Sequence, residues 1–276
     1  MLFVFPCDYF DHKQPDGFYA GEYELAGTIG AERLLIDFDR LLEGCDPFGS
    51  FEGKGQTFVW RGWQMPASVY GSFCDCAAYH GLVPLTDAEA YAACHELERA
   101  YDLCGEHMSP TAFVAVDDVD ENTIEQVFEE LECERLFVKD LVKGAYDRPC
   151  MLDRDHPDDW ICEIERLKRD RGDALTEDLV FKAWVDGFHG ETRFFVIGGK
   201  ICCAQGHAGG DGEVDVSACQ AVLDESGISA VSRFFTIDMA LDGDGNAFVV
   251  ETGDGQVSEC DSTCAVELIG ALVKLD

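Results

Sequence analysis

Two acidic residues in the last third of the chain have the spacing to bind a divalent cation. Asp238 lies in the apolar run Phe234–Leu241, and Glu251 lies in a second apolar run, Ala247–Thr252. The turn sequence Asp-Gly-Asp-Gly-Asn separates the runs, so the stretch predicts a β-hairpin. Carboxylate oxygens are the ligands that Mg²⁺ and Ca²⁺ prefer. A metal site on this hairpin is therefore the first chemical hypothesis that the sequence supports.

The register of the hairpin decides whether the two carboxylates meet. If Asp242 opposes Ala247, then Asp238 lies directly opposite Glu251, with Cβ atoms roughly 5 Å apart. Two carboxylates at that distance repel each other unless a cation lies between them. The alternative is a solvated face on which the two charges diverge into water. Alternation along the strands gives a core face of Phe235, Ile237, Met239, Leu241, Phe248 and Val250, and an opposite face of Thr236, Asp238, Ala240, Val249 and Glu251.

Basic residues are scarce, which makes those within apolar runs informative. The 276-residue chain has 20 Lys and Arg against 55 Asp and Glu, a formal net charge of −35. Such a surface repels nucleic acid phosphates and anionic lipids, so we expect neither nucleic acid nor a membrane as a partner. The acidity is consistent both with a high-salt cytoplasm and with generic solubility. An anionic ligand such as ATP would need a metal ion and a local set of basic side chains, for which the candidates are Arg61, Lys139, Lys143, Lys182 and Arg193.

The first hundred residues predict an α/β unit that positions Arg61. Strands are expected at Leu2–Phe5 and Thr57–Trp60, and the apolar spacing between them predicts a helix over Gly21–Leu42. Arg61 follows directly after the second strand. Ligands bind outside the carboxyl ends of strands in open α/β sheets, so Arg61 is a candidate ligand-binding residue. An ordinary surface arginine is the alternative.

The periodicity after a boundary near residues 105–110 predicts an α+β part. Helices, some of them before this boundary, are expected at Cys74–His80, Asp87–Leu103 with Thr86 as N-cap, Thr123–Glu132 with Asn122 as cap, Trp160–Lys168, Val216–Ser226 and Cys264–Leu275. Strands are expected at Phe113–Val116, Arg135–Val138, Leu179–Val185, Glu191–Ile197 and Lys200–Ala204. The rest of the charge-rich stretch 146–173 is expected to be a long loop that covers a substrate.

Neither the cysteines nor the apolar segments indicate an exported or membrane-spanning protein. The 14 cysteines are scattered, without zinc-ribbon spacing, so we interpret most of them as buried thiols, with a catalytic cysteine as a minority hypothesis. No uninterrupted apolar run reaches 18 residues, and the first residues lack a basic segment and a cleavage site. We therefore expect no transmembrane helix, no signal peptide and a cytoplasmic location.

The order of these features resembles the ATP-grasp superfamily of carboxylate–amine ligases. The resemblance rests on FVK at 137–139, VFKAWV at 180–185, ETRFFVIGGKI at 191–201, and TIDMAL and FVVETGDGQ within 236–256. RGW at 61–63 and the opening FPCD resemble the N-terminal part of a clade characterised by one arginine and two lysines. The resemblance implies an α+β ATP-grasp fold at 107–276, preceded by an α/β domain at 1–106. Residues 107–185 would be the smaller nucleotide-clasping subdomain, and 186–276 the metal-binding subdomain.

The resemblance also implies how ATP would be held. A strand lysine, Lys139, would contact the phosphates, with Lys143 as the second basic group and Lys182 as its competitor. Arg193 would contact phosphate or the developing acyl phosphate. The linker that binds adenine through its backbone would consist of Ala183, Trp184 and Val185.

The implied metal ligands coincide with the pair that the hairpin register suggests. Asp238 and Glu251 would hold Mg²⁺, with two ions expected and Mn²⁺ as a substitute. Gly253 stands where the family usually has Asn. Asp254 would supply the missing oxygen only if a bulge re-aims it, because successive residues of a strand point to opposite faces.

The implied reaction joins a carboxylate to an amine, through an acyl phosphate made from ATP. Its catalytic residues would be Arg193, Lys143 and Arg61, the last orienting the acceptor carboxylate. The partners would be small-molecule or peptide carboxylates and amines. A phosphotransferase of the same fold and a non-catalytic acidic nucleotide-binding protein are the alternatives. The sequence specifies neither the substrates nor the oligomeric state.

Overall fold

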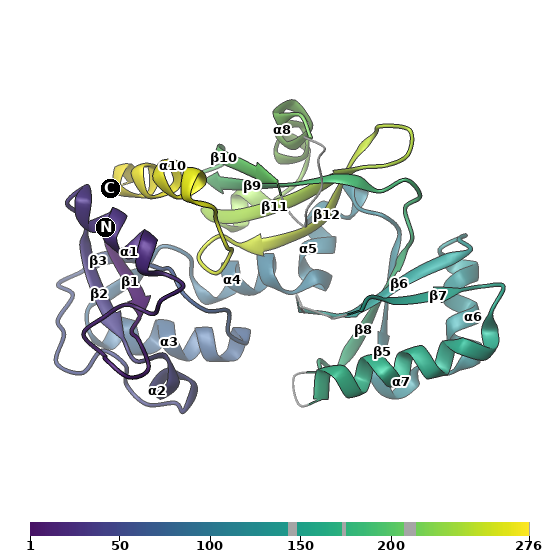
Figure 1. Ribbon diagram of the computed structural model, residues 1–276, viewed down its shortest axis with the longest axis horizontal. Coiled ribbons are helices and arrows are strands. Elements are labelled where there is room, and N and C mark those ends of the chain that lie inside the picture. The colour runs from purple at the N-terminus through teal and green to yellow at the C-terminus, as the bar shows by residue number, and fades with distance from the viewer. Residues whose placement is uncertain (143–147, 173–174, 207–213, 276) are drawn as a thin grey trace.

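Three four-stranded sheets organise the molecule. The computed structural model describes residues 1–142, 148–172, 175–206 and 214–275, and within them the sheets have the orders β2-β1-β3-β4, β5-β8-β6-β7 and β10-β9-β11-β12. We call them the N-terminal, small and C-terminal sheets. Figure 1 shows the N-terminal and small sheets at opposite ends of the molecule, with the C-terminal sheet and the helices below it in between.

The N-terminal sheet is parallel, and its central strand is buried on both faces. Leu2 and Val4 pack with helices α2 and α3, whereas Phe3 and Phe5 pack with α1 and the C-terminal helix α10. The continuous apolar sequence of this strand is typical of such two-sided burial. The elements are β1 (Leu2–Pro6), α1 (Ala20–Thr28), β2 (Glu32–Ile36), α2 (Phe38–Leu42), β3 (Gln56–Trp60), α3 (Ala67–Tyr79) and β4 (Leu82–Pro84).

The single helix predicted over Gly21–Leu42 is wrong. Helix α1 ends at Thr28, and Gly30 follows with a φ of 81°, which favours glycine. The chain then enters β2, which pairs with β1 from Glu32 to Ile36. A short apolar run fits a helix or a buried strand equally well by periodicity, so the glycine marks the boundary.

The small sheet is antiparallel and has a core of its own. Helices α6 and α7 contribute Phe128 and Trp160 to that core, with ring centroids 5.1 Å apart. Strand β7 and helix α7 occupy most of the stretch predicted to be a long covering loop, so that prediction is wrong for residues 150–171. The elements are η1 (Gly105–His107), β5 (Thr111–Ala115), η2 (Val116–Asp118), α6 (Glu121–Glu130), β6 (Arg135–Asp140), β7 (Cys150–Asp153), η3 (Pro157–Asp159), α7 (Trp160–Arg171) and β8 (Asp178–Ala183).

The C-terminal sheet is antiparallel, and both of its predicted hairpins are confirmed. On one face Phe194 and Ile237 pack with helices α5 and α8. On the other face Phe195 and Phe234 pack with α10 and β1, which leaves the far end of this face for polar residues. The elements are β9 (His189–Ile197), β10 (Lys200–Gly206), α8 (Val216–Glu225), α9 (Ile228–Val231), β11 (Phe234–Leu241), β12 (Ala247–Asp254), α10 (Ser262–Leu272) and η5 (Val273–Leu275).

The helix predicted over Asp87–Leu103 is broken in two at Glu96. This residue is extended, with φ −91° and ψ 119°, between α4 (Ala88–His95) and α5 (Leu97–Cys104). The side chain of Asp87 caps α4, so the prediction of Thr86 as the cap is wrong. Both helices contact β12 of the C-terminal sheet. The break thus lies beside the strand that carries Glu251.

The described residues contain no helix that combines the length and the apolar character needed to cross a bilayer. The prediction that most cysteines are buried is too broad, because six of the 14 are buried and Cys45 and Cys162 are exposed.

Candidate active site

Arg193, Asp238 and Glu251 form one row across three neighbouring strands. Asp238 of β11 pairs in register with Glu251 of β12 on one side and with Arg193 of β9 on the other. Directly opposed residues point to the same face of a sheet, with Cβ atoms roughly 5 Å apart. The predicted opposition of Asp238 and Glu251 is therefore confirmed.

The register nearer the turn differs from the prediction. Leu241, and not Asp242, opposes Ala247, and an irregularity between Asp238 and Met239 restores the expected pairing. The extra residue lies on β12, at Val250. As a result Val249 lies in the core, where Val250 was expected.

The same shift moves Phe248 off its predicted core face. Phe248 lines a cavity instead of the core. The bulge also leaves the carbonyl oxygen of Val250 within 2.5 Å of Lys182 Nζ.

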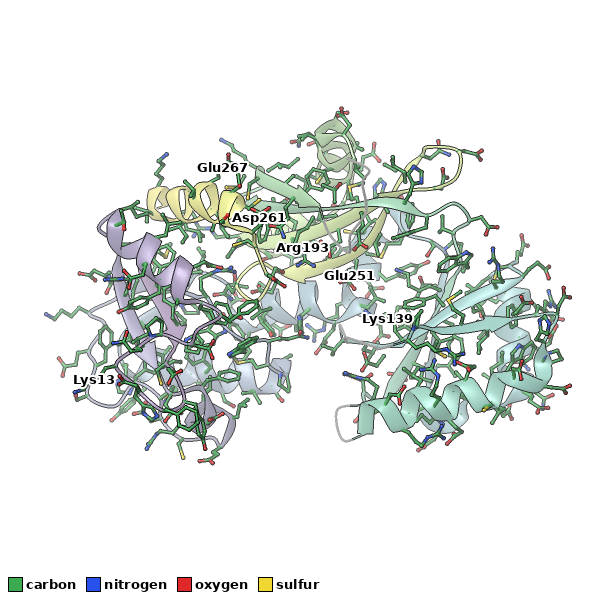
Figure 2. All side chains as sticks on the ribbon, viewed as in Figure 1. Lys13, Lys139, Arg193, Glu251, Asp261 and Glu267 are labelled. Atoms are coloured by element: carbon green, nitrogen blue, oxygen red, sulfur yellow. The ribbon has the colours of Figure 1, made fainter. Side chains whose placement is uncertain are left out.

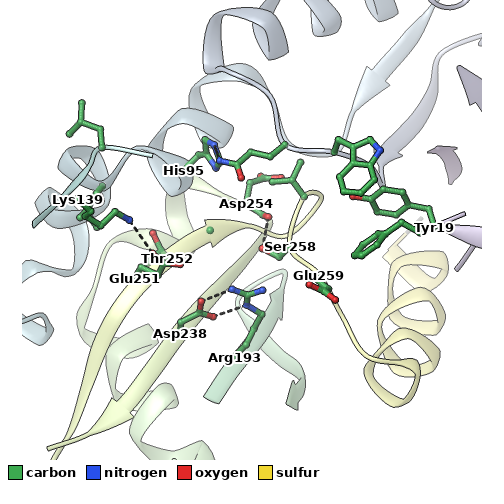
Figure 3. Close-up of a pocket in the computed structure, with 17 residues that line it drawn as sticks. Tyr19, His95, Lys139, Arg193, Asp238, Glu251, Thr252, Asp254, Ser258 and Glu259 are labelled. Carbon is green, nitrogen blue, oxygen red and sulfur yellow. Dashed lines mark hydrogen bonds and ion pairs between the residues drawn. The ribbon is translucent and has the colours of Figure 1, made fainter. Parts of the chain in front are cut away.

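Two ion pairs hold the row of charges. Arg193 Nε and Nη2 donate to the two carboxylate oxygens of Asp238 at 2.8 and 2.6 Å, and both side chains are buried. Lys139 of the small sheet reaches across to Glu251, with Nζ and Oε2 3.3 Å apart. Figure 2 shows Lys139 on the small sheet, and Arg193 and Glu251 on the C-terminal sheet; Figure 3 draws the two pairs as dashed lines. Burial opposes the charge of Arg193, but the hydrogen bonds and charge of Asp238 raise its pKa above the ordinary value.

Two cavities meet at the Lys139–Glu251 pair, which lines both of them. The larger has a volume of about 380 Å³ and also contains Arg193 and Asp238 in its wall. The smaller has a volume of about 240 Å³ and lies against the linker that follows β8. A ligand that extends through both cavities would pass directly over the row of charges.

The smaller cavity contains the residues predicted to bind a nucleotide base. Ala183, Trp184 and Val185 all line it. The amides of Ala183 and Trp184 bind the carbonyls of Pro110 and Arg135 at 2.8 and 3.0 Å. Among the described residues the amide of Val185 has no hydrogen-bond partner, so it is able to donate to a ligand.

Lys182 also lines the smaller cavity, beside Lys139. Its side chain is buried, and burial together with the charge of Lys139 lowers the pKa of its ammonium group to about 8. Lys143, the other predicted basic group, lies outside the described residues. The two lysines that the described structure brings together are thus Lys139 and Lys182.

The lowered pKa of Lys182 predicts a pH-dependent affinity for polyphosphates. Below about pH 8 the side chain carries a charge, and a bound phosphate would hold that charge at higher pH. Above pH 8 the free protein has lost the proton, so the affinity for Mg²⁺–ATP should fall by up to about tenfold per pH unit. Calorimetric titrations at pH 7, 8 and 9 measure this directly.

Lys182→Arg is the matched variant, because arginine keeps its charge over this pH range. It should abolish the loss of affinity above pH 8. An identical pH profile for the two proteins would show that Lys182 does not bind phosphate.

An aromatic wall from the N-terminal domain closes the larger cavity. The ring centroids of Phe18, Tyr19 and Trp63 lie 5.0 to 5.1 Å from one another. Gln64 and His95, whose Nε2 atoms are 2.8 Å apart, extend the wall on the other side. This wall offers stacking surfaces and polar atoms for a second ligand next to the row of charges.

Arg61 does not line either of the two cavities. It is fully buried and binds both carboxylate oxygens of Glu22 at 2.7 Å. Its Nη1 also donates to the carbonyls of Gly255, Gln256 and Ser258 at 2.6, 3.0 and 3.2 Å. These contacts tie the loop after β12 to the N-terminal domain. The expected role of Arg61 at an acceptor carboxylate therefore does not match its contacts, which are those of a positioning residue.

Asp254 is not brought together with the other two predicted metal ligands. It pairs with Phe235 on the opposite face of β12 from Glu251, because no bulge lies between positions 251 and 254. Within the described chain, the three carboxylates do not form a group with oxygens within 4.8 Å of one another. Burial raises the pKa of Asp254 to about 7, and hydrogen bonds from Gln256 offset this only in part.

Replacing Asp254 by Asn should therefore stabilise the protein at alkaline pH. A carboxyl whose pKa rises from 3.8 to about 7 on folding is most favourable below pH 3.8 and loses that advantage as the pH rises through 7. At pH 8 the variant should gain up to about 4 kcal/mol in unfolding free energy, and the gain should shrink between pH 7 and pH 5. Urea unfolding at pH 5, 6 and 8 provides the measurement. A destabilised variant with lost Mg²⁺ dependence would instead restore Asp254 as a metal ligand.

Gly253 lies on the same face as Glu251 and has no room for a side chain. A Cβ atom there would lie 2.8 Å from Thr236 Oγ1 and 3.1 Å from Ser258 Oγ. The two hydroxyls are 3.0 Å apart. Hydroxyl groups thus occupy the space next to Glu251 in which a side chain at position 253 would otherwise lie.

Several site residues were not predicted from the sequence. Glu191 lines the smaller cavity, and its spacing of two from Arg193 was a usable signal, since both point to one face of β9. His95 and Gln64 gave no signal, because their positions depend on the break at Glu96 and on loop packing.

The chemistry of Asp238 and Glu251 fits Mg²⁺. Both are carboxylates, both point to the cavity face, and basic residues that suit phosphate oxygens flank them. Mg²⁺ binds through one or two carboxylates together with substrate phosphates. These two residues would therefore hold the ion.

The comparisons with known proteins agree on the fold. Residues 150–274 match the model of an ATP-grasp domain, family 3 of the clade named for one arginine and two lysines. No curated protein sequence matches the chain significantly. The solved structure of D-cycloserine synthetase DcsG has a TM-score of 0.68 and 16% identity, covering 99% of each chain.

Two further solved structures have the same architecture. ATP-grasp ligase PsnB, complexed with precursor peptide PsnA2 and AMPPNP, has a TM-score of 0.65 and 13% identity, over 99% of this chain and 96% of its own. D-alanine-D-alanine ligase from Coxiella burnetii has a TM-score of 0.63 and 12% identity, over 98% and 90%. The predicted α+β ATP-grasp fold is thus confirmed.

Proposed function

The chain is an ATP-grasp superfamily protein, and from this premise we propose that it is an ATP- and Mg²⁺-dependent ligase that joins a carboxylate to an amine. The observation that carries the proposal is the meeting of two cavities at the Lys139–Glu251 pair. One cavity suits a nucleotide and the other suits a second substrate. Phosphoryl transfer needs both reactants in line over a set of positive charges.

The smaller cavity would hold the nucleotide. The base would lie against the linker, where the amide of Val185 donates a hydrogen bond to it. The phosphates would point toward Lys182 and Lys139. Both lysines are buried, so their charges act in a region of low dielectric, where they attract phosphate more strongly than they would in water.

Mg²⁺ held by Asp238 and Glu251 would neutralise charge on the transferring phosphoryl group. One ion or two are compatible with this pair, and Mn²⁺ would substitute. Ser258 Oγ, next to Gly253, would supply a further oxygen where the chain lacks a side chain. The basic residues of the row would exchange partners, so that Lys139 and Arg193 turn from carboxylates to phosphate oxygens.

The reaction follows from these positions. A carboxylate oxygen of the first substrate attacks the γ-phosphorus of ATP, the bond to the β-phosphate oxygen breaks, and ADP leaves. The acyl phosphate keeps the phosphoryl group beside Arg193. The amine nitrogen then attacks the acyl carbon, inorganic phosphate leaves, and the amine loses a proton as the amide forms. Arg193 stabilises the charge that develops on the phosphate in both steps.

The larger cavity would hold the carboxylate and amine substrates. Phe18, Tyr19 and Trp63 give it a wall on which an apolar, aromatic or cationic group can stack. The similar proteins act in their titles on a small molecule or on peptides, which gives the two classes of substrate to be tested.

The test is ADP release across a panel of amino acids, short peptides and amines, followed by mass spectrometry of the product. A ligase releases ADP and phosphate and gives an amide that is heavier than either substrate. A phosphorylated product without amide would identify a phosphotransferase. The absence of any thermal shift with Mg²⁺–ATP would leave a non-catalytic protein, since a ligand at 100 times its Kd stabilises by about 2.7 kcal/mol.

A further inference from the structure

Three metal-ligating side chains meet on the N-terminal domain, outside the active site. Asp46 lies in the segment between α2 and β3, and Cys76 and His80 lie four residues apart at the end of α3, whose position Figure 1 shows. One ligand atom of each residue lies within 4.8 Å of the others. His80 Nε2 is 3.0 Å from Asp46 Oδ2, and Cys76 Sγ donates to Asp46 Oδ1 at 3.4 Å.

The imidazole of His80 is held in the orientation that a metal ligand needs. Its Nδ1 lies 2.7 Å from the carbonyl oxygen of Phe51, so Nε2 is the nitrogen that faces Asp46. The ring also packs on Phe48, with centroids 5.4 Å apart. Metal-bound histidines commonly have such a carbonyl partner on the second ring nitrogen, which fixes the ring and its tautomer.

The spacing of the two helix residues supports the same interpretation. Cys76 and His80 are separated by four positions, so they lie on one face of α3. Asp46 approaches that face from a different segment of the chain. A sulfur, a nitrogen and an oxygen ligand therefore converge from two elements, which is how tetrahedral sites are built.

We propose that Asp46, Cys76 and His80 bind one Zn²⁺ ion, with water as the fourth ligand. A thiolate and an imidazole favour zinc over Mg²⁺, which prefers oxygen ligands alone. The site is therefore distinct in its chemistry from the carboxylate pair on the C-terminal sheet.

The position of the site indicates a structural role. Zinc would fasten the segment around Asp46 to the end of α3. The same helix carries Tyr70, whose ring stacks on Tyr91 with centroids 4.1 Å apart and whose hydroxyl accepts a hydrogen bond from Gln256 at 2.7 Å. We therefore expect zinc to stabilise the N-terminal domain without serving the reaction.

Co²⁺ provides a spectroscopic test on the full-length reduced protein. After treatment with a chelator, one equivalent of Co²⁺ should give the near-ultraviolet absorption of a cobalt–thiolate bond, and one equivalent of Zn²⁺ should remove it. Millimolar Mg²⁺ should leave both titrations unchanged. Cys76→Ser should abolish the absorption, and His80→Gln should weaken Zn²⁺ binding at least about tenfold.

Cys162→Ser is the matched control, because Cys162 is an exposed thiol on α7 of the small sheet. Its titrations should equal those of the unmodified protein. Circular dichroism confirms that each variant folds, and Asp46→Asn provides a milder third variant. Absence of a stoichiometric cobalt–thiolate band, or a band that survives in Cys76→Ser, would overturn the proposal.

Discussion

Replacement of Glu251 by Gln is expected to lower Mg²⁺-dependent ADP release by at least about 100-fold while leaving the fold intact. The change removes a metal-binding charge and keeps the shape of the side chain. Glu251 is only partly buried and pairs with Lys139, whose ammonium group retains the neutral amide oxygen as an acceptor. The measurement is ADP release with varied Mg²⁺, together with the thermal midpoint of unfolding.

Glu267→Gln serves as the control, because Glu267 is an exposed residue of α10 with the same chemistry and no place in the cavities. Its turnover should equal that of the unmodified protein. Asp238→Asn should also lose turnover, but with a loss of stability, since Arg193 is buried and would lose its carboxylate partner. Full turnover in Glu251→Gln would exclude the proposed metal site.

Replacement of Arg61 by Met is expected to destabilise the protein by about 3–5 kcal/mol, the cost of leaving a buried charge without its partner. The guanidinium pairs with Glu22 and holds three carbonyls of the loop after β12. Burial alone would raise the pKa of Glu22, but the charge and hydrogen bonds of Arg61 keep it below the ordinary value. Urea unfolding at pH 7 measures the loss.

The double variant Arg61→Met with Glu22→Gln separates the two possible roles of Arg61. It should recover part of the stability, because no uncompensated charge remains. If Arg61 bound an acceptor carboxylate, the single variant would unfold like the unmodified protein and would raise the KM for that substrate alone.

The pairing of Asp238 with Glu251 could be predicted from the sequence, although the reason was incomplete. Alternation of apolar residues identified the two strands, and a turn of glycine and aspartate joined them. The predicted turn register was one residue off, and the bulge at Val250 restored the pairing at the acidic residues. A bulge has no distinct sequence signal, so the face of Phe248 could not be predicted.

Contacts between distant segments account for the rest of what the sequence left open. Lys139 meets Glu251 across 112 positions, and Arg61 meets the loop at Gly255 across 194. Local periodicity identified these basic residues as unusual but contained no information on their partners. The same limit applies to Cys76, whose neighbour Asp46 lies in another segment. Helix boundaries failed where a glycine or an extended residue, as at Gly30 and Glu96, interrupted an apolar pattern.

The central claim is that Asp238 and Glu251 hold the magnesium of a bound nucleotide while Lys139 and Arg193 contact its phosphates. A crystal structure of the protein with Mg²⁺ and a non-hydrolysable ATP analogue tests it most directly. We expect the ion between the two carboxylates, with the base against Ala183–Val185 and the phosphates over Lys139. A nucleotide bound elsewhere, or an ion that touches neither carboxylate, would contradict it.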